Sequence, residues 1–111
     1  MNDGGARAVA FAQARIGLPY CWGGNGPHCF DCSGLTRAAW QAGGKTIPRT
    51  SEQQGTLLAA VPFELLKPGD IVWKPGHVAL YVGNGYALGA TKTGDVVRYQ
   101  PLKSFVRAVR P

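Results

Sequence analysis

Cys32 and His77 are the two side chains whose chemistry could form a catalytic pair in this chain. A cysteine thiol is the best side-chain nucleophile near neutral pH, and histidine is its usual base. Cys32 stands in the stretch Phe30-Asp31-Cys32-Ser33-Gly34, directly before a helical pattern, and Asp31 has the position of a helix N-cap. The N–H groups of the first helical turn would then face the thiol and could later hold an oxyanion. We therefore interpret Cys32 as a nucleophile at the start of a helix.

The chain has two histidines, and their sequence contexts differ. His28 lies on a glycine-rich loop, where we expect it to be exposed. His77 begins a strand predicted over residues 77–82, in which Val78 and Leu80 share an aliphatic face while His77 points to the other face. His77 is therefore the better candidate for the base.

The same region also allows two other interpretations. Cys21, His28, Cys29 and Cys32 are four potential ligands for tetrahedral zinc, and Cys29-x-x-Cys32 could be a redox pair. Structural zinc sites usually combine ligand pairs that lie far apart in sequence, and no parallel βαβ pattern surrounds the motif as a redox pair would require. A Cys21–Cys29 disulfide would leave Cys32 free, which is compatible with catalysis outside a reducing cytosol. We expect no metal site and no cofactor.

Composition and charge limit the possible partners. The 111 residues suit a single domain over residues 1–111, and the Gly and Pro content indicates a loop-rich globular protein. Twelve Lys and Arg against six Asp and Glu give a net charge of +6, which favours a polyanionic partner. The basic residues are scattered, without a run or an aromatic stacking platform, so we expect no nucleic acid. No apolar run reaches membrane-spanning length, so we expect no membrane insertion.

The elements that must position Cys32 and His77 follow from the periodicity of the chain. Helical spacing of apolar residues predicts helices over 5–16, with Asp3 as a possible cap, and over 32–42. Ser51 and Gln54 have the spacing of a capping box, which predicts that the stretch 48–54 opens a short third helix with Ser51 as its N-cap. Strands are predicted as an antiparallel meander over residues 71–74, 77–82, 86–91, 95–100 and 104–109. This order indicates an α+β fold with N-terminal helices packed on an antiparallel β-sheet.

Three residues outside the predicted helices are candidates for substrate binding. Tyr20 and Trp22 lie on the irregular loop 18–27, where each could either anchor the core or wall a substrate groove. Arg49 directly precedes the third predicted helix, and we expect it to be held in place rather than free.

Five stretches resemble, in order, the successive motifs of the NlpC/P60 cysteine peptidases. They are Leu18-Pro19-Tyr20-x-Trp22-Gly23-Gly24, Phe30-Asp31-Cys32-Ser33-Gly34-Leu35, Pro48-Arg49-Thr50-Ser51-x-x-Gln54, Leu66-x-Pro68-Gly69-Asp70-Ile71-Val72 and Gly76-His77-Val78-Ala79-Leu80-Tyr81-Val82-Gly83-Asn84-Gly85. The resemblance implies a papain-like α+β fold in which the nucleophile begins a helix packed on an antiparallel sheet. It also implies cleavage of peptidoglycan stem peptides, typically between D-γ-glutamyl and a diamino acid such as meso-diaminopimelate.

The resemblance also implies roles for single residues. Cys32 matches the nucleophile and His77 the general base, Tyr20 lies beside the nucleophile, and Asp31 and Ser33 flank the substrate subsites. An acid and a hydroxyl beside the thiol could bind the amines and carboxylates of a stem peptide. Asp31 cannot give its carboxylate fully both to a helix cap and to a substrate amine, so its main role stays open.

One position departs from the family pattern. Members usually carry a third polar residue, most often His and sometimes Glu, twelve positions after the base, and here that residue is Gly89. If Gly83-Asn84-Gly85 forms a three-residue loop, Gly89 pairs opposite Ala79 and Thr91 opposite His77. Thr91 or a water could then orient the imidazole as the third catalytic group. A two-residue turn would shift this register.

Two functions therefore remain under consideration. The first is an active cysteine endopeptidase, which the presence of Cys32 and His77 favours. The alternative is a peptidoglycan-binding module with weakened or lost catalysis, which Gly89 favours. In either case we expect a monomer that acts on the bacterial cell wall. The polar start at residues 1–5 lacks the features of a signal peptide, which suggests a phage-type endolysin released through a host-lysis pore, or an excised domain of a secreted enzyme.

Overall fold

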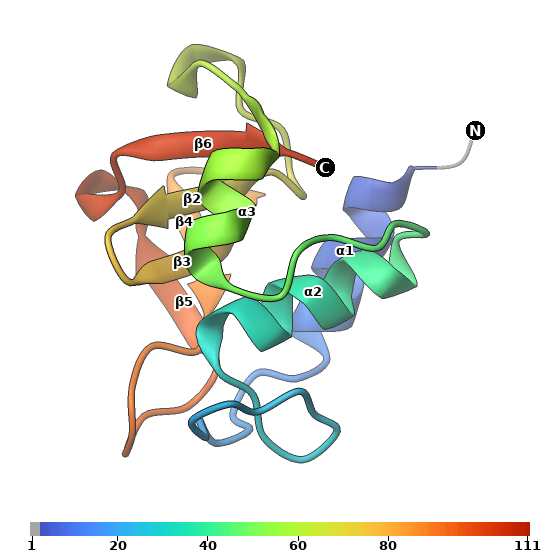
Figure 1. Cartoon of the computed structure of the whole chain (residues 1–111), viewed down its shortest axis with the longest axis vertical. Coiled ribbons are helices and arrows are strands. Elements are labelled where there is room, and N and C mark those ends of the chain that lie inside the picture. Colours follow the sequence, from blue (N-terminus) through green and yellow to red (C-terminus); the bar gives the residue numbers. More distant parts are fainter. Residues whose placement is uncertain (1–2) are drawn as a thin grey trace.

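The computed structural model describes residues 3–111, in which three α-helices lie against a six-stranded antiparallel β-sheet (Figure 1). The helices are α1 (Gly4–Gln13), α2 (Cys32–Ala42) and α3 (Ser51–Leu57). Met1 and Asn2, part of the polar start considered above, lie outside the described residues. The predicted α+β class is confirmed. Within residues 3–111, no helix has both the length and the apolar character that crossing a bilayer requires.

The helix that begins with Cys32 has the predicted bounds, because both of its ends are marked locally in the sequence. Asp31 caps its N-terminus through its side chain. At the other end, the N–H of Gly43 donates to the carbonyl of Ala39, and a second glycine follows directly. The position of Cys32 in the first turn is therefore fixed by its sequence neighbours.

The first helix is shorter than predicted. Asp3 caps it as expected, since its Oδ1 accepts a hydrogen bond from the N–H of Ala6 at 3.2 Å. It ends at Gln13 rather than at residue 16. The chain turns there toward Gly17, whose φ of 93° cannot continue a right-handed helix.

Thr50, and not Ser51, caps the third helix. The Oγ1 of Thr50 accepts a hydrogen bond from the N–H of Gln53 at 3.2 Å. Gln54 is fully buried, and its Oε1 accepts a hydrogen bond from the hydroxyl of Thr36 in α2 at 2.7 Å. The predicted Ser51–Gln54 capping box is therefore wrong, because the Gln54 amide satisfies buried polar groups instead of the helix end.

The sheet combines the predicted meander with one return strand. Its strands are β1 (Ala59–Ala60), β2 (Ile71–Lys74), β3 (His77–Gly83), β4 (Tyr86–Gly89), β5 (Arg98–Pro101) and β6 (Arg107–Arg110), in the spatial order β1-β6-β2-β3-β4-β5. The meander is correct for β2 to β5 and wrong for β6, which returns to pair with β2 and β1. Ala108 and Val109 are both buried, so β6 suits this inner position better than an edge.

Alternation along β3 divides the core as predicted. Val78 and Leu80 belong to the main hydrophobic core with residues of α1 and α2. Ala79 belongs to a smaller cluster on the opposite face, together with Phe105. His77 lies on this second face, where its ring stacks on Phe105 with the ring centroids 5.6 Å apart. The first residue of β3 is thus held against a small apolar cluster.

The turn between β3 and β4 differs from the three-residue loop considered above. Asn84 and Gly85 both have positive φ, 56° and 80°, as a two-residue type I′ turn requires. Gly83 pairs with Tyr86 across this turn. On its own, such a turn would shift the register by one residue.

A β-bulge cancels that shift. The pairing changes between Tyr81 and Gly83, so that one additional residue lies in β3 and Leu80 pairs with Leu88. This register places Gly89 beside Ala79, as predicted, and a Cβ built on Gly89 would lie 3.0 Å from the Ala79 Cβ. The alignment of the strand that carries His77 with β4 is therefore the predicted one, reached by a different turn.

Candidate active site

Cys32 lies where the N-terminus of α2 meets the start of β3. The Oδ1 of Asp31 accepts a hydrogen bond from the N–H of Gly34 at 2.6 Å, which fixes the first turn of the helix. Cys32 is half-buried and is the only free cysteine among residues 3–111. The backbone N–H of Val78, the residue after His77, acts on this thiol and favours its ionised form. The two candidate catalytic residues thus come from elements that meet at the thiol.

The pKa of the Cys32 thiol is raised above its ordinary value. Burial is the largest cause, and the nearby Asp31 carboxylate adds to the rise. Hydrogen bonds from the backbone N–H groups of Val78, Ser33 and Cys32 itself oppose it. The resting group at neutral pH is therefore a thiol, which needs a base to become a nucleophile, and the N–H groups that face it can stabilise negative charge.

His77 is held by a residue that the sequence analysis did not single out. Its Nε2 lies 3.0 Å from the Oε1 of Gln100, which comes from β5. The Gln100 Nε2 in turn donates to the Oγ1 of Thr91 at 2.7 Å, which leaves its Oε1 for the imidazole. Gln100 therefore accepts a hydrogen bond from His77 Nε2–H. Thr91, the predicted orienting residue, reaches the ring only through Gln100.

The other ring nitrogen of His77 is available for proton transfer. Within the described part of the chain, the buried Nδ1 has no hydrogen-bond partner. Because Nε2 carries the proton, Nδ1 carries the lone pair. Burial lowers the pKa of His77, with smaller contributions from Lys74 and Arg98, while the hydrogen bond to Gln100 raises it. The imidazole is thus neutral at neutral pH and can accept a proton.

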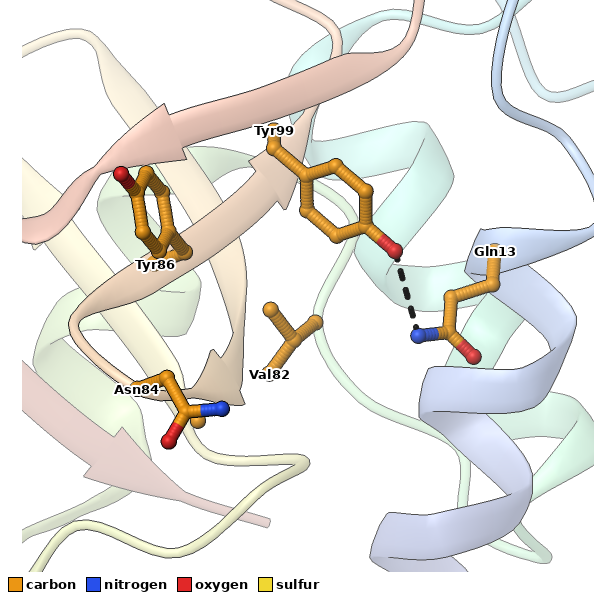
Figure 2. A pocket seen from close by; sticks show the side chains of 6 residues that line it. Gln13, Val82, Asn84, Tyr86 and Tyr99 are labelled. Atoms are coloured by element: carbon orange, nitrogen blue, oxygen red, sulfur yellow. Dashed lines mark hydrogen bonds between the residues drawn. The ribbon is translucent and has the colours of Figure 1, made fainter.

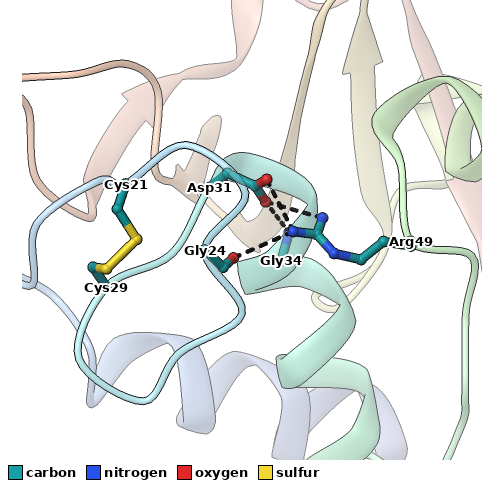
Figure 3. The surroundings of a disulfide bond; sticks show 6 residues. All are labelled: Cys21, Gly24, Cys29, Asp31, Gly34 and Arg49. Atoms are coloured by element: carbon teal, nitrogen blue, oxygen red, sulfur yellow. Dashed lines mark hydrogen bonds and ion pairs between the residues drawn. A yellow bond between two sulfur atoms is a disulfide. The ribbon is translucent and has the colours of Figure 1, made fainter.

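Arg49 occupies the carboxylate of Asp31. The guanidinium donates to Oδ1 at 3.1 Å and to Oδ2 at 3.0 Å, in a two-pronged ion pair (Figure 3). Arg49 also donates to the hydroxyl of Ser33 at 2.9 Å and to the carbonyl of Gly24 at 3.5 Å. Together with the helix cap, these bonds use both carboxylate oxygens of Asp31. Arg49 is thus held in place, and the question left open for Asp31 is decided in favour of the cap and the ion pair in this structure.

A disulfide closes the loop that precedes the nucleophile. Cys21 and Cys29 are bonded to each other, which leaves Cys32 free (Figure 3). The bond removes two of the four ligands that a zinc site would need, and it also takes Cys29 out of a Cys29–Cys32 redox pair. His28 lies on the same loop and is exposed, as predicted.

The substrate-binding candidates line one cleft of about 630 Å³ over Cys32. The cleft is lined by Tyr20, Trp22, Asp31, Ser33 and Arg49, and Thr91 also lies on its wall. Trp22 is 90% exposed, so it walls the cleft and does not anchor the core. Burial and the nearby Cys32 and Asp31 raise the pKa of Tyr20, so its hydroxyl remains a hydrogen-bond donor beside the thiol.

A second hollow, of about 330 Å³, lies toward the other end of β3 (Figure 2). Gln13, Val82 and Tyr99 are among the side chains that line it, and the Gln13 amide donates to the Tyr99 hydroxyl at 3.3 Å. Its lining side chains include neither a nucleophile nor a charged group. The cleft over Cys32 contains the candidate nucleophile and is the candidate active site.

Comparison with known proteins identifies the family to which the chain is similar. A model of the NlpC/P60 family matches residues 17–108. A probable endopeptidase of Corynebacterium glutamicum is 40% identical over 111 residues, which cover 93% of this chain and 53% of the relative. The gamma-D-glutamyl-L-lysine dipeptidyl-peptidase of Bacillus subtilis is 40% identical over 90 residues, covering 74% of this chain and 30% of the relative. The solved peptidoglycan hydrolase RipB of Mycobacterium tuberculosis has a TM-score of 0.84 at 32% identity, over 96% of this chain and 64% of that one. The chain thus spans about half the length of the Corynebacterium relative.

Proposed function

Because the chain belongs to the NlpC/P60 family, we propose that it is a cysteine endopeptidase that hydrolyses peptidoglycan stem peptides. The bond cleaved is the one between D-γ-glutamyl and a diamino acid such as meso-diaminopimelate or lysine. The observation that carries the proposal is the state of His77: Gln100 holds one ring nitrogen, and the other is left with its lone pair beside the helix that begins with Cys32. This chain has Gly89 where the family usually carries the residue that orients the base. Gln100 supplies the contact to His77 instead.

The first half of the reaction forms an acyl-enzyme. The Cys32 sulfur attacks the γ-carbonyl carbon of D-glutamate while its proton passes to Nδ1 of His77. In this proposal the backbone N–H groups at the start of α2 and the hydroxyl of Tyr20, which lines the cleft, donate to the developing oxyanion. The C–N bond then breaks, and the imidazolium of His77 gives its proton to the leaving amine of the diamino acid.

The second half regenerates the thiol. Water attacks the thioester and gives a proton to the now neutral His77. The C–S bond breaks, the D-glutamyl carboxylate leaves, and the Cys32 sulfur takes its proton back. The cycle consumes one water and needs no cofactor.

The substrate and the place of action are supported by three further observations. The Bacillus subtilis relative is named for a γ-D-glutamyl-lysine bond, and RipB for peptidoglycan hydrolysis. The Cys21–Cys29 disulfide suits a protein that works outside a reducing cytosol, as a hydrolase of the cell wall must. The net charge of +6 would favour retention on an anionic wall polymer.

The proposal is tested with a synthetic stem peptide that contains a γ-D-glutamyl–diamino acid bond. We expect the protein to release a fragment that begins with the diamino acid, and Cys32→Ala to release none, because no other side chain can form the thioester. Mass spectrometry of the products identifies the bond. Binding of the peptide without any cleavage that depends on Cys32 would instead favour the binding-module alternative.

The pH dependence of kcat/KM follows from the two shifted pKa values. His77 must be neutral to accept the thiol proton, and burial lowers its pKa below the ordinary 6.5, so we expect the midpoint of the acid limb below 6.5. The pKa of Cys32 is raised above its ordinary 9.0, so the alkaline limb should have its midpoint above 9.0. A profile with its acid midpoint above 6.5 would show that the imidazole is not the buried neutral base described here.

A further inference from the structure

Glu52 is the unpaired charge of the cleft. The charged side chains that line it are Asp31, Arg49 and Glu52. Asp31 and Arg49 form an ion pair at 3.0 Å, so their charges cancel locally. Among residues 3–111, no cation lies within ion-pair distance of the Glu52 carboxylate, whose hydrogen bond from the N–H of Gly76 is 3.4 Å long. The cleft is thus locally anionic in a protein whose net charge is +6.

The position of Glu52 places it on the side of the cleft where the leaving amine of the scissile bond must lie. Gly76, the residue that Glu52 contacts, directly precedes His77 in the chain. His77 is the group that gives a proton to the leaving amine, so the residue that carries this amine must lie on the His77 side of the cleft. In the proposed reaction that residue is the diamino acid. Tyr20 and Trp22, in contrast, come from the loop before α2.

We propose that Glu52 binds the side-chain ammonium of the diamino acid and thereby selects substrates that carry one at this position. The assignment rests on the proposed function and deepens it. A carboxylate without a protein cation is complementary to an ammonium group, and a flexible four-carbon stem lets a lysine-type side chain reach an acceptor on the cleft wall. Asp31 is not free for this role, because Arg49 and the cap of α2 use both of its oxygens.

The test combines a change in the protein with a change in the substrate. Two stem peptides are compared, one with lysine after γ-D-glutamate and one with norleucine, which has the same stem without the ammonium. Glu52→Gln removes the charge and keeps an oxygen that can accept from Gly76 N–H. Glu64→Gln, on the exposed 3₁₀ turn Phe63–Leu65 away from the cleft, is the matched control for loss of one negative charge.

We expect Glu52→Gln to lower kcat/KM for the lysine peptide about fivefold and to leave the norleucine peptide unchanged, as for an exposed ion pair. Added salt should reduce the difference, and Glu64→Gln should affect neither peptide. An equal loss of kcat/KM on both peptides would show that Glu52 only stabilises the fold of α3. No loss on either peptide would show that Glu52 does not bind the substrate. Each result overturns the inference.

Binding gives a readout that does not depend on turnover. In a Cys32→Ala background, calorimetry should show tighter binding of the lysine peptide than of the norleucine peptide, and Glu52→Gln should remove that preference. If wild-type protein cleaves neither peptide while this preference is observed, the proposed peptidase activity fails and the role of Glu52 stands. If both peptides are cleaved and bound equally well, the peptidase activity stands and the role of Glu52 is wrong.

Discussion

We expect His77→Ala to lower kcat/KM on a stem peptide by roughly 10⁴-fold, the upper range for loss of a general base, and His28→Ala to leave it unchanged. This difference is expected because the two histidines have opposite environments. His77 is 5% exposed and hydrogen-bonded through Nε2, and among residues 3–111 its buried Nδ1 has no hydrogen-bond partner. His28 lies exposed on the disulfide-closed loop and does not line the cleft. Without His77, the raised pKa of Cys32 leaves the thiol protonated and unreactive at neutral pH.

The His77 variant needs a control for stability, because the ring also packs on Phe105. Removing a buried aromatic ring typically costs about 3–5 kcal/mol of unfolding free energy. His77→Gln keeps more of the volume and a polar end, so it should be folded at the assay temperature and still inactive. Thermal unfolding of both variants separates loss of fold from loss of the base. An equal loss of activity in His28→Ala and His77→Ala would show that the wrong histidine has been assigned as the base.

The nucleophile helix could be predicted from sequence because its signals are local. Asp31 caps α2, apolar residues recur at helical spacing, and two glycines follow its last residue. The face of the sheet on which His77 lies could be predicted for a similar reason, since alternation along a single strand decides it. Neither prediction depends on how distant parts of the chain pair.

The orienting residue could not be predicted in this way, because its place depends on pairing between strands. Gln100 lies on the His77 face of the sheet because it pairs with Ala87 across β4 and β5. That register is set by the irregular segment between these strands, which has no periodic signal. The sequence shows only a glutamine in a predicted strand. Its function depends on two contacts of the Gln100 amide, that of Oε1 with His77 and that of Nε2 with Thr91.

The predicted alignment of Gly89 with Ala79 shows how a correct result can have a different cause. That prediction is conditional on a three-residue loop; the loop is a two-residue turn, and the bulge in β3 compensates for the missing residue. A bulge has no reliable signature in a single sequence, since it is selected by the packing of both strands. The use of Asp31 was undetermined for the same kind of reason, because Arg49 reaches it from 18 residues further along the chain.

Replacing Gln100 with alanine is expected to lower kcat about 10²-fold, since an orienting group sets the tautomer and direction of the base. The change leaves the buried Nε2–H of His77 without an acceptor, and it frees the ring to carry its proton on the wrong nitrogen. Thr91→Val should have a smaller effect in the same direction, because it removes only the acceptor that holds the Gln100 amide. Both effects are measured as kcat on the same stem peptide.

The pH profile separates an orienting role for Gln100 from a merely structural one. The hydrogen bond that His77 Nε2–H donates to Gln100 raises the pKa of His77 against the effect of burial. Gln100→Ala should therefore move the acid limb of kcat/KM to lower pH. Gln100→Glu places a carboxylate at the same position, favours the imidazolium, and should move the limb to higher pH while restoring part of kcat. A structural role alone would lower kcat in both variants without moving the limb in opposite directions.

A substitution at Gly89 is the most specific control for the orienting role of Gln100, because the absent side chain of Gly89 leaves the space that the Gln100 amide fills. A Cβ at Gly89 would lie 3.3 Å from the Gln100 Nε2 and 3.0 Å from the Ala79 Cβ, so Gly89→His alone should displace the amide and lower activity. In a Gln100→Ala background the same histidine has room to reach His77 from β4, and the double variant should be more active than Gln100→Ala. If the double variant is no more active than Gln100→Ala, an acceptor beside the His77 Nε2 is not enough to restore activity, and the strand that supplies the acceptor also matters. If the double variant is more active, catalysis requires only an acceptor beside the His77 Nε2, and in this chain β5 supplies that acceptor instead of β4.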